Sequence, residues 1–159
     1  MPPLVYIDTN VFILGFEGPT SVAEPVRRFL WSLREFPGAA ITSELTLAEL
    51  TAPAASTSVI DIHARRQIYS ELLILNSFIE MHEVSRGVLV DTSMFRQMAA
   101  ARGFRPKLPD SIHVVTAARA GCRYVMSYDA RLRPLEAWMK AISASDESIE
   151  TVMRELRAR

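Results

Sequence analysis

The sequence predicts an α/β protein in which helices cover both faces of a parallel sheet, and three observations lead to that expectation. Short apolar runs rich in β-forming residues alternate along the chain with longer segments of helical periodicity. The chain has 159 residues, of which 49% are hydrophobic, so it can bury a sizeable core as one domain, residues 1–159. Its 18 basic and 18 acidic side chains cancel, and a neutral chain this rich in apolar residues is not intrinsically disordered.

The first elements lie before residue 43. Residues 4–7 are apolar, rich in β-formers and too short for a helix, so they are expected to form a buried strand that ends at Asp8. The following VFILG is expected to form a short turn. Residues 20–35 begin with residues that can cap a helix, show helical periodicity and end at a proline-glycine pair, which predicts a helix. The second strand is expected at residues 39–42.

Two helices are expected next. The first begins at Ser43, a good capping residue, and ends near Pro53. The segment AASTS is expected to form a loop, and a longer helix follows at residues 60–76. Apolar residues of that helix recur at helical spacing: Ile68, Leu72 and Leu75.

The third predicted strand, residues 78–84, rests on alternating side chains. A helix is expected at residues 85–102, because Gly103 follows its periodic pattern. Residues 105–109 form a stiff connector, since two prolines restrict the backbone there. A helix at residues 110–120 follows, with a proline suited to its first turn and a glycine at its end.

The last elements are a fourth strand at residues 123–127, a short helical piece at 133–138, an edge strand at 139–142 and a final helix at 146–156. Right-handed crossovers place the carboxyl ends of parallel strands along one edge, where proteins of this class bind ligands. Side chains that directly follow the strands are therefore the first candidates for function.

The composition excludes several classes of protein. The single cysteine, Cys122, cannot form an internal disulfide and no secretion signal is visible, so the chain is expected to be cytoplasmic. No apolar run approaches the roughly 20 residues that cross a bilayer, so no membrane contact is expected. A net charge of zero gives no sign of nucleic-acid binding, and any such function must depend on where the charges lie.

Four acidic side chains follow or flank the predicted strands. Asp8 follows the first strand, Glu49 lies in the helix after the second, Asp110 opens the helix before the fourth, and Asp129 lies two residues past Ser127. Carboxylates that converge need raised pKa values or a neutralising cation. Oxygen ligands suit Mg²⁺ or Mn²⁺, which can polarise a phosphodiester and activate a water molecule. These acids therefore indicate a metal site for phosphate chemistry.

Each acid also has a structural interpretation. Asp8 can cap the turn that follows it, Asp110 can complement a helix dipole, and Asp129 can hold a turn. Glu49 lies in a mostly apolar helix, where a buried acid needs a partner or a cation. Glu44, in the first turn of the same helix, is its competitor as a ligand. From these residues alone, a metal site and four independent structural acids both remain open.

Motifs around these acids favour the metal site. Four segments carry them: YIDTNVFI, ITSELTLAEL, LPDSIHVVTAARAG and YVMSYDARL. Together, over nearly the whole chain and in the right order, these segments resemble the PIN-domain ribonuclease family, and in particular the VapC-type toxins of toxin–antitoxin pairs. Carried over position by position, the acids of the family correspond to Asp8, Glu49, Asp110 and Asp129.

The resemblance implies a Mg²⁺- or Mn²⁺-dependent endoribonuclease with a three-layer α/β/α fold. Asp8, Glu49 and Asp110 would form the core of the metal site, with Asp129 as a fourth ligand or as holder of a metal-bound water that Ser127 orients. Asn10 would have a structural role at the junction of strand and helix. Tyr128 departs from the family pattern, which often has a smaller polar residue there. The family also implies an antitoxin partner and a homodimer.

Basic residues flank the proposed site on both sides. The candidates for contact with the RNA backbone are Arg102, Arg105, Lys107, Arg131 and Arg133. Singly, each is more simply a solvated surface residue. His113 is expected to line the pocket without a catalytic role, and Cys122 to be a buried filler without an activating base.

Two other functions remain as alternatives. A phosphatase that uses Asp8 as nucleophile needs a second aspartate two positions later, where this chain has Asn10. A binding module that keeps the PIN fold without turnover is the other alternative, and the presence of all four acids argues against it.

Overall fold

A five-stranded sheet forms the centre of the computed structural model, which describes residues 1–52 and 59–159. The strands are β1 (Val5–Ile7), β2 (Ala40–Ser43), β3 (Ile79–His82), β4 (Tyr124–Met126) and β5 (Lys140–Ile142). They pair in the order β3-β2-β1-β4-β5, and every pair is parallel. The predicted parallel sheet, including its edge strand, is therefore confirmed.

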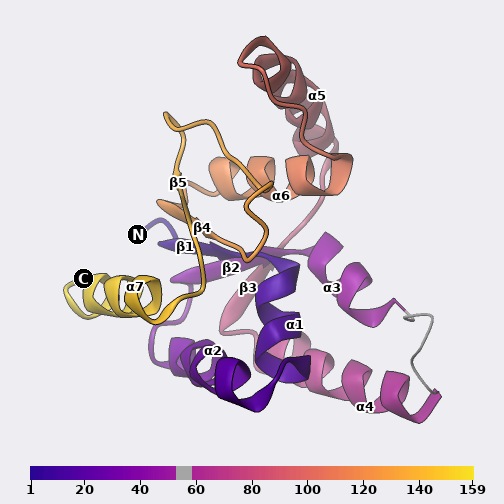
Figure 1. Cartoon of the computed structure of the whole chain (residues 1–159), viewed down its shortest axis with the longest axis vertical. Coiled ribbons are helices and arrows are strands. Elements are labelled where there is room, and N and C mark those ends of the chain that lie inside the picture. Colours follow the sequence, from indigo (N-terminus) through magenta and orange to yellow (C-terminus); the bar gives the residue numbers. More distant parts are fainter. Residues whose placement is uncertain (53–58) are drawn as a thin grey trace.

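Helices cover both faces of the sheet (Figure 1). On one face lie α5 (Arg86–Ala101) and α6 (Leu108–Arg119). The other face carries α1 (Thr9–Glu17), α2 (Thr20–Ser32), α4 (Val59–Ser70) and α7 (Asp146–Arg157). The remaining elements are α3 (Glu44–Thr51), which follows β2, the 3₁₀ turn η1 (Leu33–Glu35) and the π turn η2 (Glu71–Leu75). This is the three-layer α/β/α arrangement that the sequence predicted.

The central strand β1 shows how the two cores are built. Val5 and Ile7 pack into the core shared with α1, α2 and α7, whereas Tyr6 packs into the core under α5 and α6. All three side chains are fully buried, as expected for a strand covered on both faces. Packing on both faces fixes the position of the sheet, and therefore also the positions of the residues that follow its strands at the carboxyl edge.

The first helix was not predicted. Asp8 caps the nine-residue helix α1 rather than a short turn, and Val11 and Phe12 of this helix are buried. Gly15, the last residue of the expected turn, lies at the contact with α2. A Cβ atom there would come within 3.2 Å of Leu30 Cδ1, so glycine permits the two helices to pack closely.

The expected helical piece at residues 133–138 is wrong. The backbone N–H of Trp138 donates to the carbonyl of Leu135 at 2.8 Å and closes a single turn. Pro134 lacks an N–H group, and Leu132 and Leu135 are buried, so tertiary anchoring outweighs helical preference in this segment.

The predicted helix at residues 60–76 changes its winding before its end. Residues Glu71–Leu75 form the π turn η2, which adds a residue to the turn and rotates the buried face. Tyr69, Leu72 and Leu73 are buried, whereas Ile68 and Leu75 of the predicted stripe are exposed. The expected helix end near Pro53 and the loop AASTS lie outside the described residues.

The other predicted elements are observed with small shifts of their ends. The third strand is shorter than the expected 78–84, and the helix expected at 20–35 ends in the 3₁₀ turn η1. Helix α6 begins at Leu108, with Pro109 in its first turn as expected. Among the described residues, no helix is both long and apolar enough to cross a membrane.

Candidate functional site

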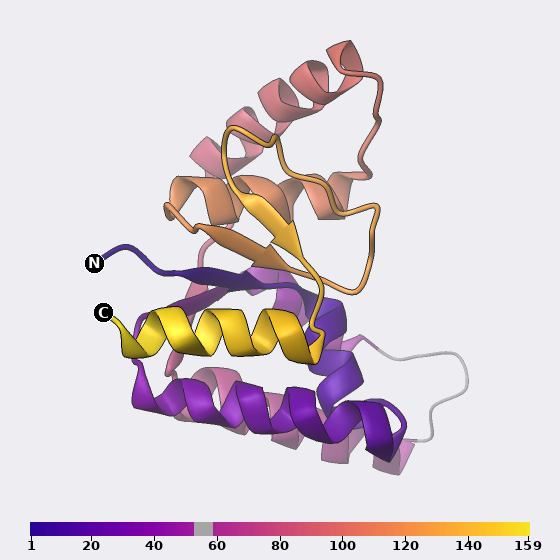
Figure 2. The same cartoon turned by 60° about the vertical axis from the view of Figure 1, so that its left-hand side comes forward.

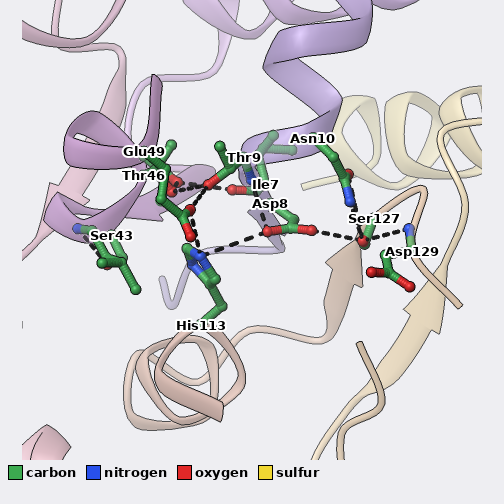
Figure 3. A network of polar contacts seen from close by, with 12 residues as sticks. Ile7, Asp8, Thr9, Asn10, Ser43, Thr46, Glu49, His113, Ser127 and Asp129 are labelled. Carbon is green, nitrogen blue, oxygen red and sulfur yellow. Dashed lines mark hydrogen bonds and ion pairs between the residues drawn. The ribbon is translucent and has the colours of Figure 1, made fainter. Parts of the chain in front are cut away.

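The predicted acids lie at the carboxyl edge of the sheet, opposite the edge where both chain termini lie (Figure 1). Figure 3 shows three of them, Asp8, Glu49 and Asp129. Asp8 follows β1, Glu49 lies in α3 after β2, Asp110 lies in the first turn of α6, and Asp129 follows β4. We call these four residues and their surroundings the acidic edge. The structure thus brings together side chains that are separated by up to about 120 positions in the sequence.

Asp8 is held by hydrogen bonds to both carboxylate oxygens. The backbone N–H of Thr9 donates to Oδ1 at 2.8 Å, and the hydroxyl of Ser127 donates to Oδ2 at 2.7 Å. Only 5% of Asp8 is exposed. Burial raises the pKa of this carboxyl, and the nearby His113 and the two hydrogen bonds offset the effect only in part. Asp8 is therefore fixed in position, and its negative charge is poorly compensated.

Ser127 and Asn10 connect the end of β4 to the start of α1. The Asn10 amide Nδ2 donates to Ser127 Oγ at 3.0 Å, and Asn10 Oδ1 accepts from the backbone N–H of Tyr128 at 2.9 Å. The backbone N–H of Asp129 also donates to Ser127 Oγ, at 3.0 Å. Asn10 thus takes up contacts that fit its expected structural role, and the Ser127 proton is directed at Asp8.

Glu49, and not Glu44, lies beside Asp8. Thr9 Oγ1 donates a short hydrogen bond to Glu49 Oε2, which also lies 3.0 Å from His113 Nε2. Burial opposes ionisation of Glu49, but the hydrogen bonds from His113 and Thr9 outweigh it and lower the pKa. Glu44 is exposed and accepts a hydrogen bond from the backbone N–H of Val84 at 3.4 Å.

His113 lies between the two carboxylates, and sequence analysis underestimated it. Its Nδ1 atom lies 2.6 Å from the hydroxyl of the fully buried Tyr6. Its Nε2 atom lies 3.0 Å from Glu49 Oε2 and 3.8 Å from Asp8 Oδ1 (Figure 3). Burial raises the pKa of Tyr6, so its phenol keeps its proton and can donate it to Nδ1. The proton of a neutral imidazole then lies on Nε2, directed at Glu49.

A signal for this role exists in the sequence. His113 lies three residues after Asp110, which places both on one face of a helix. Its neighbours Ile112, Val114 and Val115 are apolar, so burial of the imidazole and a need for polar partners could have been inferred.

Three threonines, Thr9, Thr42 and Thr46, link the start of α3 to the end of β1 and the start of α1, and sequence analysis assigned a role to none of them. Thr42 Oγ1 donates to the carbonyl of Ile7 at 2.8 Å. Thr46 Oγ1 lies 2.8 Å from Thr42 Oγ1 and 3.2 Å from Thr9 Oγ1. Thr42 and Thr46 are fully buried, so these hydrogen bonds fix the start of α3 and with it the position of Glu49.

Asp110 and Asp129 form the other side of the acidic edge. Asp129 accepts hydrogen bonds from Arg131 Nε and Nη2, both at 2.9 Å, and this pairing lowers its pKa. No described residue donates a hydrogen bond to the Asp110 carboxylate. Partial burial and then the charge of Asp129 raise the pKa of Asp110.

The donor chemistry of these acids fits a hard divalent cation. Burial is the main cause of the raised pKa values of Asp8 and Asp110, and the charge of Glu49 adds to both shifts, so Glu49 repels each of these carboxylates. All the candidate ligands are oxygen atoms, as Mg²⁺ and Mn²⁺ prefer. Among residues 1–52 and 59–159, however, no three His, Cys, Asp or Glu side chains are grouped as an ion would require. Binding would therefore draw the side chains closer together.

The predicted basic residues divide into two groups. Arg105, Lys107, Arg131 and Arg133 line one cavity of about 410 Å³, which also borders Asp110. We call it the basic cavity. Arg102 does not line it, and its guanidinium Nη1 donates to the carbonyl of Met98 at 3.3 Å.

Cys122 takes no part in this region. It is a buried free cysteine in the core under α5 and α6, and burial raises its pKa to about 12. The thiol is therefore protonated at neutral pH and is a poor nucleophile.

Comparisons with known proteins give a family and a fold. A family model described as PIN domain matches residues 5–136. Among curated proteins, no match was found.

Solved structures of three DNA-bound complexes are similar in fold. DNA-bound VapBC from Salmonella typhimurium has a TM-score of 0.66 at 16% identity, covering 89% of this chain and 98% of that chain. VapBC2 from Rickettsia felis, bound to a promoter DNA fragment, has a TM-score of 0.63 at 12% identity, covering 88% and 98%. FitAB bound to the IR36 DNA fragment has a TM-score of 0.62 at 18% identity, covering 88% and 94%.

Proposed function

The chain belongs to the PIN-domain family, and on that premise we propose that it is a metal-dependent endoribonuclease and the toxin of a VapBC-type toxin–antitoxin pair. One observation carries the proposal. Acids from four separate segments lie at the carboxyl edge of the sheet, and burial, with a smaller effect of the neighbouring charges of Asp129 and Glu49, raises the pKa values of Asp8 and Asp110. Clustered carboxylates repel one another and destabilise a fold unless a bound cation neutralises them, so their clustering at this edge indicates a functional site.

In this proposal, Asp8, Glu49 and Asp110 hold Mg²⁺ or Mn²⁺, and Asp129 is a fourth ligand or holds a water beside it. When bound, such an ion polarises the phosphodiester and makes water a better nucleophile. The surrounding residues fix the ligands. Ser127 and the backbone of Thr9 hold Asp8, and His113 with the Thr9 hydroxyl holds Glu49.

The proposed partners are an RNA substrate, a cognate antitoxin and a second copy of the chain. The similar structures are VapBC and FitAB complexes, which supports an antitoxin as partner. The proposed setting is the cytoplasm, where RNA and a co-expressed antitoxin would meet the protein.

We expect the purified protein to cleave RNA in Mg²⁺ or Mn²⁺ and to lose this activity in EDTA. Excess metal added after EDTA should restore cleavage, because the carboxylates remain in place without the ion. Gel analysis of labelled RNA, with DNA of the same sequence as control, measures the effect. RNA cleavage that persists in EDTA would contradict metal dependence, and no cleavage under any metal would favour a binding module.

Replacing His113 with leucine is expected to lower kcat/KM for RNA cleavage about tenfold, because Glu49 loses the hydrogen bond that positions it. His113→Gln should recover most of the activity, since the glutamine amide reaches about as far as Nε2. The metal concentration for half-maximal activity should rise in His113→Leu and return in His113→Gln. If the two variants are equally impaired, His113 serves packing and not the position of Glu49.

A further inference from the structure

The basic cavity has an arrangement of charges that the metal site does not explain. It lies where the connector from α5 to α6 meets the segment after β4, two parts of the chain that run side by side (Figure 2). Its volume of about 410 Å³ is within the range of ligand sites. One wall is Asp110 of the acidic edge, so a molecule in the cavity lies next to the proposed reaction site.

Three of the four cations around the cavity have no acidic partner. Arg131 pairs with Asp129, but no carboxylate of the described residues pairs with Arg105, Lys107 or Arg133. All three side chains are exposed. The charge of Lys107 helps to lower the pKa of Asp129, but among the described residues neither it nor the two arginines is held in a direct ion pair. Cations without an ion-pair partner along a concave wall attract an anion, and phosphate suits both guanidinium and ammonium groups.

Arg133 is held in a way that free surface arginines are not. Its guanidinium carbon lies 4.8 Å from the centre of the Phe104 ring, and Phe104 in turn packs edge-on to the buried Phe95 at 6.4 Å. The ring fixes one side of the guanidinium, and the exposed outer side remains available. An arginine plane fixed on an aromatic ring is a surface on which a nucleobase can stack.

We infer that the basic cavity is a subsite for one unpaired nucleotide of the substrate, with its base stacked on Arg133 and its phosphate bound by Arg105 and Lys107. A base in a duplex is covered by its neighbours, so only an unpaired nucleotide can reach this surface. The inference rests on the proposed function, because it places the nucleotide beside the bond to be cut at Asp110.

The test uses a short single-stranded RNA carrying one 2-aminopurine, whose fluorescence reports stacking. Binding is measured with the cleavage-deficient Asp8→Asn protein as background, and with Arg133→Lys or Phe104→Leu added to it. Lysine keeps the charge but cannot present a plane, so Arg133→Lys should weaken binding about tenfold and abolish the fluorescence change. Phe104→Leu should act in the same direction, because it releases the guanidinium.

Controls separate stacking from charge and from the proposed function. Arg34→Lys, an exposed arginine in η1 away from the cavity, should leave binding unchanged. The same RNA annealed into a duplex should bind weakly and respond little to Arg133→Lys. If the Asp8→Asn protein bound the single-stranded RNA equally well with and without Arg133→Lys, the subsite would be overturned and the nuclease proposal would remain. If Arg133→Lys lowered the affinity for an acidic peptide but not for RNA, the cavity would be a site for a protein partner and the nucleotide subsite would be overturned. If the Asp8→Asn protein bound no RNA at all, both proposals would be overturned.

Discussion

The Asp8→Asn variant is expected to lose metal-dependent RNA cleavage, with kcat/KM lowered by about a hundredfold or more, and to keep its fold. Asparagine has the shape of aspartate but lacks the negative charge that a divalent cation needs, and such an ion contributes several kcal/mol to phosphodiester hydrolysis. The amide oxygen can still accept from the backbone of Thr9. Ser127 can turn its proton to Asn10 Oδ1, 3.4 Å away, so both structural contacts have replacements.

Thermal unfolding provides the control for this variant. Burial raises the pKa of Asp8, so protonated Asp8 favours the folded state below about pH 4, and this stability is lost as pH rises through the folded-state pKa. Ionised Asp8 therefore costs stability at neutral pH, and Asp8→Asn removes that cost. Its Tm at neutral pH should equal or exceed that of the wild type, and the difference should vanish in acid. Retained cleavage, or a large fall in Tm at neutral pH, would contradict this account of Asp8.

Added metal should increase the difference in Tm between the wild type and Asp8→Asn by its effect on the wild type alone. Mn²⁺ stabilises only a protein that binds it, so it should raise the Tm of the wild type and leave that of Asp8→Asn unchanged. An equal rise in both proteins would place the ion elsewhere.

The sheet and most of the helices could be predicted because their signals are local. Strands that are buried on both faces are recognisable as short apolar runs, and β1 and β4 are of this kind, whereas β2 also contains the buried polar residues Thr42 and Ser43. Helix α1 could not be predicted in this way, because Gly15 is needed for the contact with α2 and not for a turn. The same holds for residues 133–138, where burial of Leu132 and Leu135 decides the conformation.

The acids of the candidate site were predictable because each follows or flanks a strand, and parallel strands end at one edge. Their partners were not. Thr46 meets Thr9 only after α1 and α3 have packed together, and no spacing in the sequence specifies that contact. His113 was visible as a polar residue in an apolar helix segment, but its contact with Tyr6 joins residues 107 positions apart.

The zero net charge is misleading because the charges are segregated. Asp8, Glu49 and Asp110 lie at the acidic edge, and the unpaired cations of the basic cavity lie next to it. In the proposed function, a divalent ion would offset the acids and leave the surface beside them positive. A protein that is neutral as a whole can therefore bind RNA locally, and its weak overall field disfavours indiscriminate binding.

Glu49→Gln and Glu44→Gln form a matched pair on helix α3, and their effects should differ by about a hundredfold. Each substitution removes one negative charge from the same helix. Glutamine at position 49 can still accept from Thr9 through its amide oxygen, so the fold should persist while the proposed ligand is lost. Glu49→Gln is expected to lower kcat/KM for RNA cleavage about a hundredfold. Glu44→Gln should stay within about twofold of the wild type, because position 44 is exposed and its carboxylate accepts a long hydrogen bond from the backbone N–H of Val84, which a glutamine oxygen can also accept.

The comparison distinguishes ligand position from charge. If removing any acid near the edge impaired the enzyme through its overall field, both variants would fall together and added salt would change both alike. If Glu49 binds the ion, Mn²⁺ titrated by calorimetry should bind Glu44→Gln as tightly as the wild type and Glu49→Gln far more weakly. The reverse order would show that α3 presents its other glutamate to the ion, and that the hydrogen bonds of Thr9 and His113 to Glu49 serve the fold alone.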